Sequence, residues 1–145
     1  MLYNFSGKRV LIAGGSGHIG QAIAKQLTDA GAWVAVLDRR FPWSSLPYHV
    51  VPVECDFADE AQTRQRAQQA IEELEGLDTL IHCAALTGES GIKGYNTEFM
   101  QQTVAAWDWA MRVNLTSAFV LAQEGFHALI ASMGNIDLVS STNGL

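Results

Sequence analysis

Short apolar runs alternate along this chain with longer stretches of helical periodicity. The runs cover residues 9–13, 33–37, 49–53, 79–84 and 136–140. Short continuous apolar runs bounded by turn residues are typical of buried parallel strands. Between them, residues 19–27, 59–74 and 103–132 repeat apolar positions at helical spacing, and Asp59 is a plausible N-cap. This alternation predicts βαβ units, and therefore an α/β fold built on a doubly wound parallel sheet.

Composition supports one packed unit. The 145 residues are 48% hydrophobic and 17% charged, which excludes disorder and low complexity and allows a real core. No internal repeat or linker interrupts the pattern, so residues 1–145 are expected to form a single domain. The last apolar run lies close to Leu145 with no helix after it to cover it, so we expect the sheet to be incomplete at its C-terminal end.

Charge and cysteine content narrow the class of partner. Nine basic against 15 acidic residues give a net charge of −6, which argues against nucleic acid and anionic membranes as partners. Cys55 and Cys83 are too few for a disulfide framework or a four-ligand zinc site, and are interpreted as small buried thiols in a reducing compartment. Because no targeting or membrane-spanning run is present, a cytoplasmic protein without a metal site is expected.

A glycine-rich segment follows the first predicted strand and opens the first predicted helix. It reads Gly14-Gly15-Ser16-Gly17-His18-Ile19-Gly20. Small residues at such a turn let the backbone approach a diphosphate, whose charge is stabilised by the helix N-terminus. Asp38 ends the second predicted strand, where a carboxylate can accept both ribose hydroxyls of an adenosine. The context predicts a dinucleotide site; the alternative is a purely structural turn beside a solvated Asp38.

Two arginines complicate the choice of dinucleotide. Arg39 and Arg40 follow Asp38 directly. Guanidinium groups there could hold a 2′-phosphate, stack on adenine or lie in solvent, whereas the carboxylate would repel a 2′-phosphate. NAD is therefore favoured over NADP.

On the basis of these residues, the whole chain resembles the short-chain dehydrogenase/reductase family, which has a Rossmann fold. The turn is similar to the family's T-G-x-x-x-G-I-G, with His18 where the middle glycine is usual. The resemblance implies a cofactor-binding set of Gly14, Ser16, Gly17, His18, Ile19, Gly20, Asp38, Asp56, Phe57, Cys83, Ala84 and Ala85. Within it, Asp56 and Phe57 would bracket adenine. Residues 82–85 replace the family's N-N-A-G, and His82 is interpreted as a core group.

The resemblance also implies two residues near the reaction. Asn114 lies where the family's long helix carries an asparagine that distorts the backbone and holds a water of the proton relay. Ser141 matches the family's catalytic serine; a strand-end turn serine and an Asn114 on a solvated face are the simpler alternatives. The Tyr-x-x-x-Lys pair that transfers the proton should follow Ser141 by about a dozen positions, and the chain stops before it.

The resemblance thus predicts the N-terminal part of an NAD(P)-dependent oxidoreductase acting on a small-molecule alcohol or carbonyl, a homo-oligomer (dimer or tetramer) when complete. This chain alone is expected to be inactive. Two other readings stay open. A sugar-nucleotide epimerase or dehydratase of the family's extended branch is suggested by the spacing of Gly14, Gly17 and Gly20, and the third reading is a non-catalytic NAD-binding protein.

Overall fold

The computed structural model describes residues 3–42, 47–87 and 90–141. Within them, five parallel strands form one sheet in the order β3-β2-β1-β4-β5. The strands are β1 (Arg9–Ala13), β2 (Trp33–Asp38), β3 (Val50–Glu54), β4 (Thr79–His82) and β5 (Asn135–Leu138). Successive strands are added first on one side of β1 and then on the other. This order confirms the doubly wound α/β architecture predicted from the sequence.

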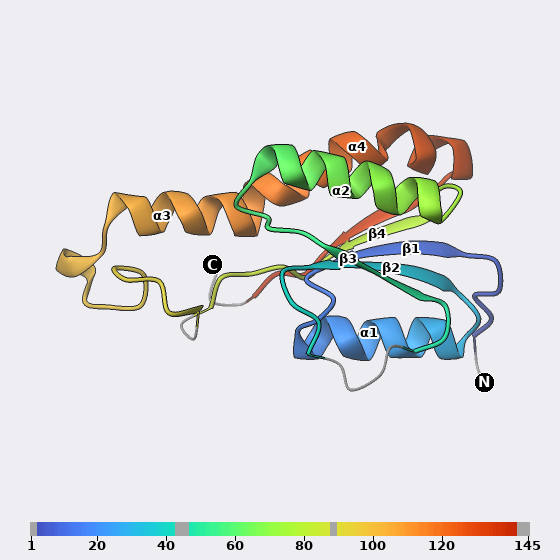
Figure 1. Ribbon diagram of the computed structural model, residues 1–145, viewed down its shortest axis with the longest axis horizontal. Helices are drawn as coiled ribbons and strands as arrows, with labels where there is room; N and C mark the ends of the chain where they lie inside the picture. The colour runs from blue at the N-terminus through green and yellow to red at the C-terminus, as the bar shows by residue number, and fades with distance from the viewer. Residues whose placement is uncertain (1–2, 43–46, 88–89, 142–145) are drawn as a thin grey trace.

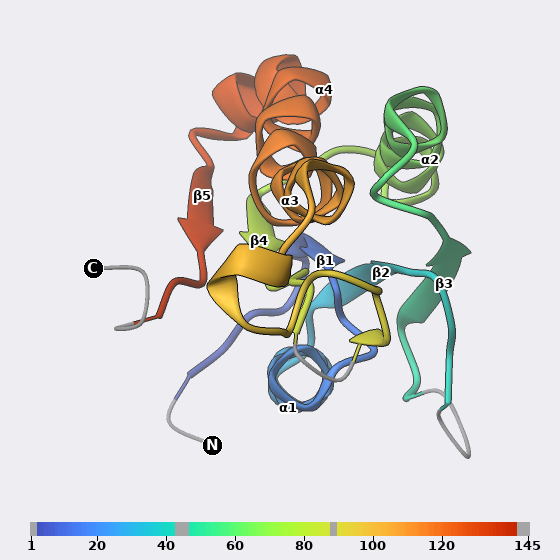
Figure 2. The ribbon, with the colours of Figure 1, turned by 90° about the vertical axis from the view of Figure 1, so that its left-hand side faces the viewer.

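Helices cover both faces of the sheet (Figures 1 and 2). Helix α1 (His18–Asp29) lies below the sheet in Figure 2, whereas α2 (Glu60–Glu73) and α4 (Ser117–Ser132) lie above it. Alternate residues of β1 therefore enter different cores. Val10 and Ile12 pack on the α1 side, and Leu11 and Ala13 on the α2/α4 side. Burial on both faces explains why β1 is a continuous apolar run rather than an alternating one.

Polar contacts fix the start of α2 and its position beside α4. The predicted N-cap is confirmed: Asp59 Oδ1 accepts a hydrogen bond of 3.0 Å from the Gln62 N–H. On the solvent side, Arg64 Nη1 lies 2.7 Å from Glu124 Oε1 and ties α2 to α4. Both side chains are partly buried. An ion pair at a protein surface typically contributes about 1 kcal/mol or less, so the packing of the apolar faces determines the arrangement.

The helical stretch predicted over residues 103–132 is observed, and it is distorted at Asn114 as the family resemblance implies. The chain forms α3 (Val104–Met111), then a π-helical turn η3 (Arg112–Thr116), and then α4. Within this turn, Asn114 Oδ1 accepts a 2.6 Å hydrogen bond from the Leu86 N–H, and Ser117 Oγ donates to the Val113 carbonyl at 2.7 Å. Side chains that bond outside the i→i−4 ladder compete with it, and π-turns are frequent at functional sites.

The bounds of four strands differ from the prediction. β2 extends one residue further, to Asp38, and β3 ends one residue later, at Glu54. β3 begins at Val50 rather than residue 49, because His49 has a φ of +69°, which is incompatible with an extended strand. β4 ends at His82, two residues early, where the chain turns toward the glycine-rich loop. β5 covers Asn135–Leu138 instead of residues 136–140, although the Val139 N–H still donates to the His82 carbonyl.

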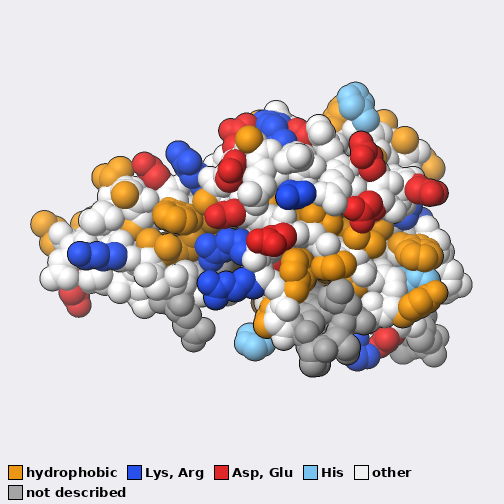
Figure 3. Space-filling model, in the orientation of Figure 1, with side chains coloured by type: hydrophobic (Ala, Val, Ile, Leu, Met, Phe, Trp, Pro, Cys, Tyr) orange, Lys and Arg blue, Asp and Glu red, His pale blue; other side chains and the backbone are white. Residues whose placement is uncertain are grey.

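The surface shows where the described chain is least covered. β5 is an edge strand, and all four of its residues are exposed. Hydrophobic side chains also gather around α3 and the preceding 3₁₀ turn η2 (Phe99–Gln101) (Figure 3); these include Phe99, Met100, Val104 and Trp107. Among the described residues, no helix is long and apolar enough to cross a membrane, and no group of potential metal ligands gathers.

Candidate functional site

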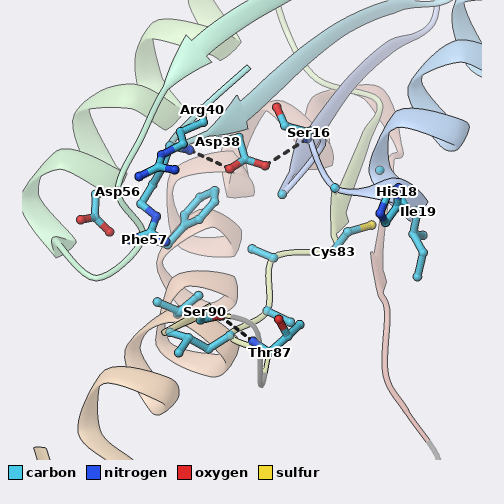
Figure 4. A pocket seen from close by; sticks show the side chains of 18 of the residues that line it. Ser16, His18, Ile19, Asp38, Arg40, Asp56, Phe57, Cys83, Thr87 and Ser90 are labelled. Carbon is cyan, nitrogen blue, oxygen red and sulfur yellow. Dashed lines mark hydrogen bonds between the residues drawn. The ribbon is translucent and has the colours of Figure 1, made fainter. Parts of the chain in front are cut away.

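A cavity of about 540 Å³ lies at the carboxyl ends of β1, β2 and β4 (Figure 4). This edge is where βα loops of a doubly wound sheet converge. Every residue predicted to bind the cofactor lines it: Gly14, Ser16, Gly17, His18, Ile19, Gly20, Asp38, Asp56, Phe57, Cys83, Ala84 and Ala85. The tertiary structure thus brings together segments that are separated by up to about half of the chain.

The glycine-rich turn offers the cavity an open helix N-terminus. No side chain caps α1, and its first turn contains no acidic residue. A Cβ added to Gly17 would meet only the Gly14 carbonyl oxygen, at 3.5 Å, so the entrance to the helix is not filled by protein atoms. Free N–H groups at a helix N-terminus attract anions. The turn therefore fits the diphosphate of a dinucleotide.

Gly14 holds this turn against the neighbouring strand. Its φ is +74°, and its N–H donates a 2.8 Å hydrogen bond to the Leu37 carbonyl. A Cβ at this position would lie 2.5 Å from the Ala84 nitrogen. Only glycine combines this backbone conformation with so close an approach. The loops after β1 and β4 consequently form one tightly packed wall of the cavity.

Asp38 lies at the end of β2 and faces the glycine-rich turn. Its Oδ2 accepts a 3.0 Å hydrogen bond from the Ser16 N–H, and its Oδ1 accepts one of 2.7 Å from the Arg39 N–H (Figure 4). These two contacts hold the carboxylate at the cavity wall. Arg39 and Arg40 line the same cavity. The carboxylate that would favour NAD and the guanidinium groups that could hold a 2′-phosphate are therefore both present there.

Asp56 and Phe57 form the wall beyond β3. Asp56 Oδ1 accepts a 3.0 Å hydrogen bond from the Ala58 N–H, and the Asp56 N–H donates one of 2.5 Å to Gln62 Oε1. Phe57 is buried. The carboxylate thus takes part in a local turn while its side chain lines the cavity.

The two cysteines are free thiols with different surroundings. Cys55 is fully buried, and burial raises the pKa of its thiol to about 11. Cys83 is partly buried and lines the cavity, and burial also raises the pKa of its thiol. Protonated thiols of this kind are weak nucleophiles. The prediction of a small buried thiol is confirmed for Cys55, whereas Cys83 is only partly buried because it borders the cavity.

His82 is a core group. It stands where the family that the sequence resembles carries an asparagine. It is 3% exposed, and its Nε2 lies 2.7 Å from Ser117 Oγ. Because the Ser117 hydroxyl donates to the Val113 carbonyl, the ring donates through Nε2–H. His82 thus connects the end of β4 to the π-turn. Burial lowers the pKa of His82, which keeps the ring neutral near pH 7.

We expect the His82→Asn variant to change how stability depends on pH. In the wild type, the unfolded histidine takes up a proton as pH falls through about 6.5, while the folded one, with its lowered pKa, stays neutral. Stability contributed by this group is present above that pH and falls by up to about 1.4 kcal/mol per pH unit below it. Urea unfolding at pH 7.5 and 5.5 measures this loss, which His82→Asn should reduce.

The matched control is His127→Gln, since His127 is an exposed histidine of α4 remote from the cavity. His127→Gln should show the same dependence of stability on pH as the wild type. An unchanged pH dependence in His82→Asn would contradict a neutral, buried His82.

The structure places Asn114 and Ser141 differently. Asn114 bonds the Leu86 N–H, and the Tyr95 hydroxyl donates to the Leu86 carbonyl at 3.0 Å, so the π-turn and the loop after β4 are held together beside the cavity. Ser141 is exposed, follows β5, and is not among the lining residues. Asn114 itself does not line the cavity either, but its neighbour Val113 does.

Sequence reasoning did not single out five further lining residues: Pro42, Leu86, Thr87, Ser90 and Val113. Thr87 and Ser90 belong to an irregular loop, where the Thr87 N–H donates a 2.9 Å hydrogen bond to Ser90 Oγ. No motif or periodicity marks such positions.

The chain matches the family model of the short chain dehydrogenases over residues 8–145. Among curated proteins, the 2,3-dihydro-2,3-dihydroxybenzoate dehydrogenase of Escherichia coli is 34% identical over 83% of this chain and 45% of its own length. The 3-oxoacyl-[acyl-carrier-protein] reductase MabA of Mycobacterium tuberculosis is 31% identical over 97% of this chain and 53% of its own length. The chain thus spans about half the length of these relatives.

Solved structures agree in fold. A short-chain dehydrogenase/reductase from Serratia marcescens superposes with a TM-score of 0.77 at 30% identity, covering 98% of this chain and 61% of that one. An NADH-dependent reductase complexed with NAD superposes with a TM-score of 0.80 at 21% identity, covering 95% of this chain and 61% of that one. The latter likeness supports the fold alone.

Proposed function

Since this chain belongs to the short-chain dehydrogenase family, we propose that it forms the cofactor-binding part of an NAD-dependent oxidoreductase that transfers hydride between the nicotinamide and a small alcohol or carbonyl. One observation carries the proposal. The uncapped N-terminus of α1, the close approach at Gly14 and the carboxylate of Asp38 border a single cavity. A diphosphate beside a ribose diol requires this combination of groups.

Each wall of the cavity has a distinct part in the proposed binding. The open turn at Gly17 would receive the diphosphate, and Asp38 would accept hydrogen bonds from the adenosine ribose. Asp56 and Phe57 would bracket the adenine, while Cys83, Ala84 and Ala85 would let the cofactor approach the end of β4. Asp38 favours NAD over NADP because a carboxylate repels a 2′-phosphate, with Arg39 and Arg40 as the opposing charges.

The bound nicotinamide would supply the hydride chemistry. Ser141 would orient and polarise the substrate carbonyl, and Asn114 would support the proton relay. The π-turn at Asn114 supports the second role, because it turns backbone groups out of the helical ladder beside the cavity. The sequence of this chain contains no Tyr-x-x-x-Lys after Ser141, so no proton donor is assigned within it.

Two other functions were considered. The comparisons do not favour the first, a sugar-nucleotide epimerase or dehydratase, because the relatives reported above are named as dehydrogenases and reductases. A non-catalytic NAD-binding protein shares every binding feature with the proposal. It differs only in hydride transfer, which must therefore be measured separately from binding.

We expect the 145-residue chain to bind NADH and to show no turnover. A positioned general acid is commonly worth 10²–10⁴-fold in rate, and none is assigned here. NADH fluorescence titration measures binding, and loss of absorbance at 340 nm with a panel of carbonyls measures turnover. A chain that fails to bind NADH would refute the proposal. Rapid turnover would show that a residue of this chain donates the proton.

A further inference from the structure

We propose that His18 binds the cofactor diphosphate through a charged imidazole, so that dinucleotide affinity rises as pH falls. The inference rests on the proposed function and deepens it, since it assigns a pH-dependent contact to the diphosphate. It concerns binding rather than turnover, and can therefore be tested on this chain as it stands.

The location of His18 at the start of α1 directs its side chain toward the cavity. His18 is the first residue of α1, directly after the N-cap Gly17. Side chains near a helix N-terminus lean toward that terminus, because every Cα–Cβ bond tilts that way. The imidazole is therefore directed toward the region into which the free N–H groups of the first turn point, and His18 lines the cavity there (Figure 4).

The surroundings of His18 leave its ring available. The side chain is exposed, and no hydrogen bond or ion pair engages it among the described residues. Figure 4 shows His18 and Ile19 across the cavity from Asp56 and Phe57. His18 thus lies on the wall that the diphosphate would approach, away from the carboxylate near the adenine end.

Among the described residues that line this cavity, His18 is the only histidine. The other titratable or charged liners of the described chain are Asp38, Arg39, Arg40, Asp56 and Cys83. Carboxylates and guanidinium groups keep their charge between pH 6 and 8.5, and burial raises the pKa of the Cys83 thiol. Histidine alone among side-chain types ordinarily changes charge in that range.

The direction of the effect follows from linkage. A diphosphate stabilises the protonated imidazole, so the complex binds a proton more tightly than the free chain does. Affinity gained in this way is fully present at low pH and is lost as pH rises. A hydrogen bond from a cation to a phosphate is stronger than one from a neutral donor. We expect wild-type affinity to be about fivefold to tenfold higher at pH 6.0 than at pH 8.5.

Calorimetric titration with NAD and with ADP-ribose at both pH values tests the proposal. The two ligands share the diphosphate and differ in the nicotinamide, so both should show the same pH dependence. His18→Gln should bind both ligands with affinities that differ by less than about twofold between the two pH values. His18→Arg, which keeps its charge, should bind equally well at both. His127→Gln is the matched control and should behave as the wild type.

The outcomes separate this proposal from the broader one. Absence of NAD binding by the wild-type chain would overturn the proposed function and this inference with it. Binding with the same pH dependence in wild type and His18→Gln would overturn the role of His18 alone. An effect of His18→Gln on NAD but not on ADP-ribose would place the histidine at the nicotinamide and would equally overturn the diphosphate contact.

Discussion

Replacing Gly14 with alanine should destabilise the chain by about 3 kcal/mol or more and abolish NADH binding. A positive φ in a residue with a side chain costs about 1–3 kcal/mol, and forcing extra atoms into a packed site costs a similar amount. Both costs apply here, since φ is +74° and the added Cβ would lie 2.5 Å from the Ala84 nitrogen. Neither backbone can yield without disturbing the β1–β4 pairing. Urea unfolding and NADH titration measure the two effects.

Gly7 provides the matched control for this prediction. Its φ is +76°, close to that of Gly14, but nothing lies within 4 Å of an added Cβ. Gly7→Ala should therefore show the cost of strain alone, about 1 kcal/mol, and keep NADH affinity. Equal destabilisation in the two variants would mean that the contact with Ala84 contributes nothing beyond the backbone conformation.

Asp38→Ala is expected to weaken NADH binding by about tenfold to a hundredfold. The estimate corresponds to loss of a hydrogen bond from a charged acceptor, about 1.5–3 kcal/mol. NADPH affinity should rise relative to that of NADH, because the repelling carboxylate is removed while Arg39 and Arg40 remain at the cavity. Titration of both cofactors against wild type and variant gives the two ratios.

Asp38→Asn is the informative companion, since it keeps the size of the side chain and its contact with the Ser16 N–H. It should lose less NADH affinity than Asp38→Ala and still gain in relative NADPH affinity. Tighter binding of NADPH than of NADH by the wild type would refute the preference for NAD and assign Arg39 and Arg40 to the 2′-phosphate.

Local rules account for much of what was predicted correctly. The apolar run at 9–13 is a strand because both of its faces are buried, one against α1 and the other against α2 and α4. Asp59 caps α2 because a short carboxylate can reach the free N–H groups of the first turn. Periodicity alone does not indicate features that depend on distant groups. Residues 103–132 have unbroken helical periodicity, yet Asn114 bonds a loop 28 positions away.

The sequence by itself determined the α/β class, the glycine-rich turn and the acid after the second strand. Each depends on residue types at short spacing, through burial periodicity, glycine conformation and helix-end electrostatics. Tertiary structure alone decided that Gly14 must approach Ala84, that His82 bonds Ser117, and that Thr87 and Ser90 border the cavity. These are contacts between segments that only sheet formation brings together, and their geometry depends on how the strands and loops pack, which no local spacing encodes.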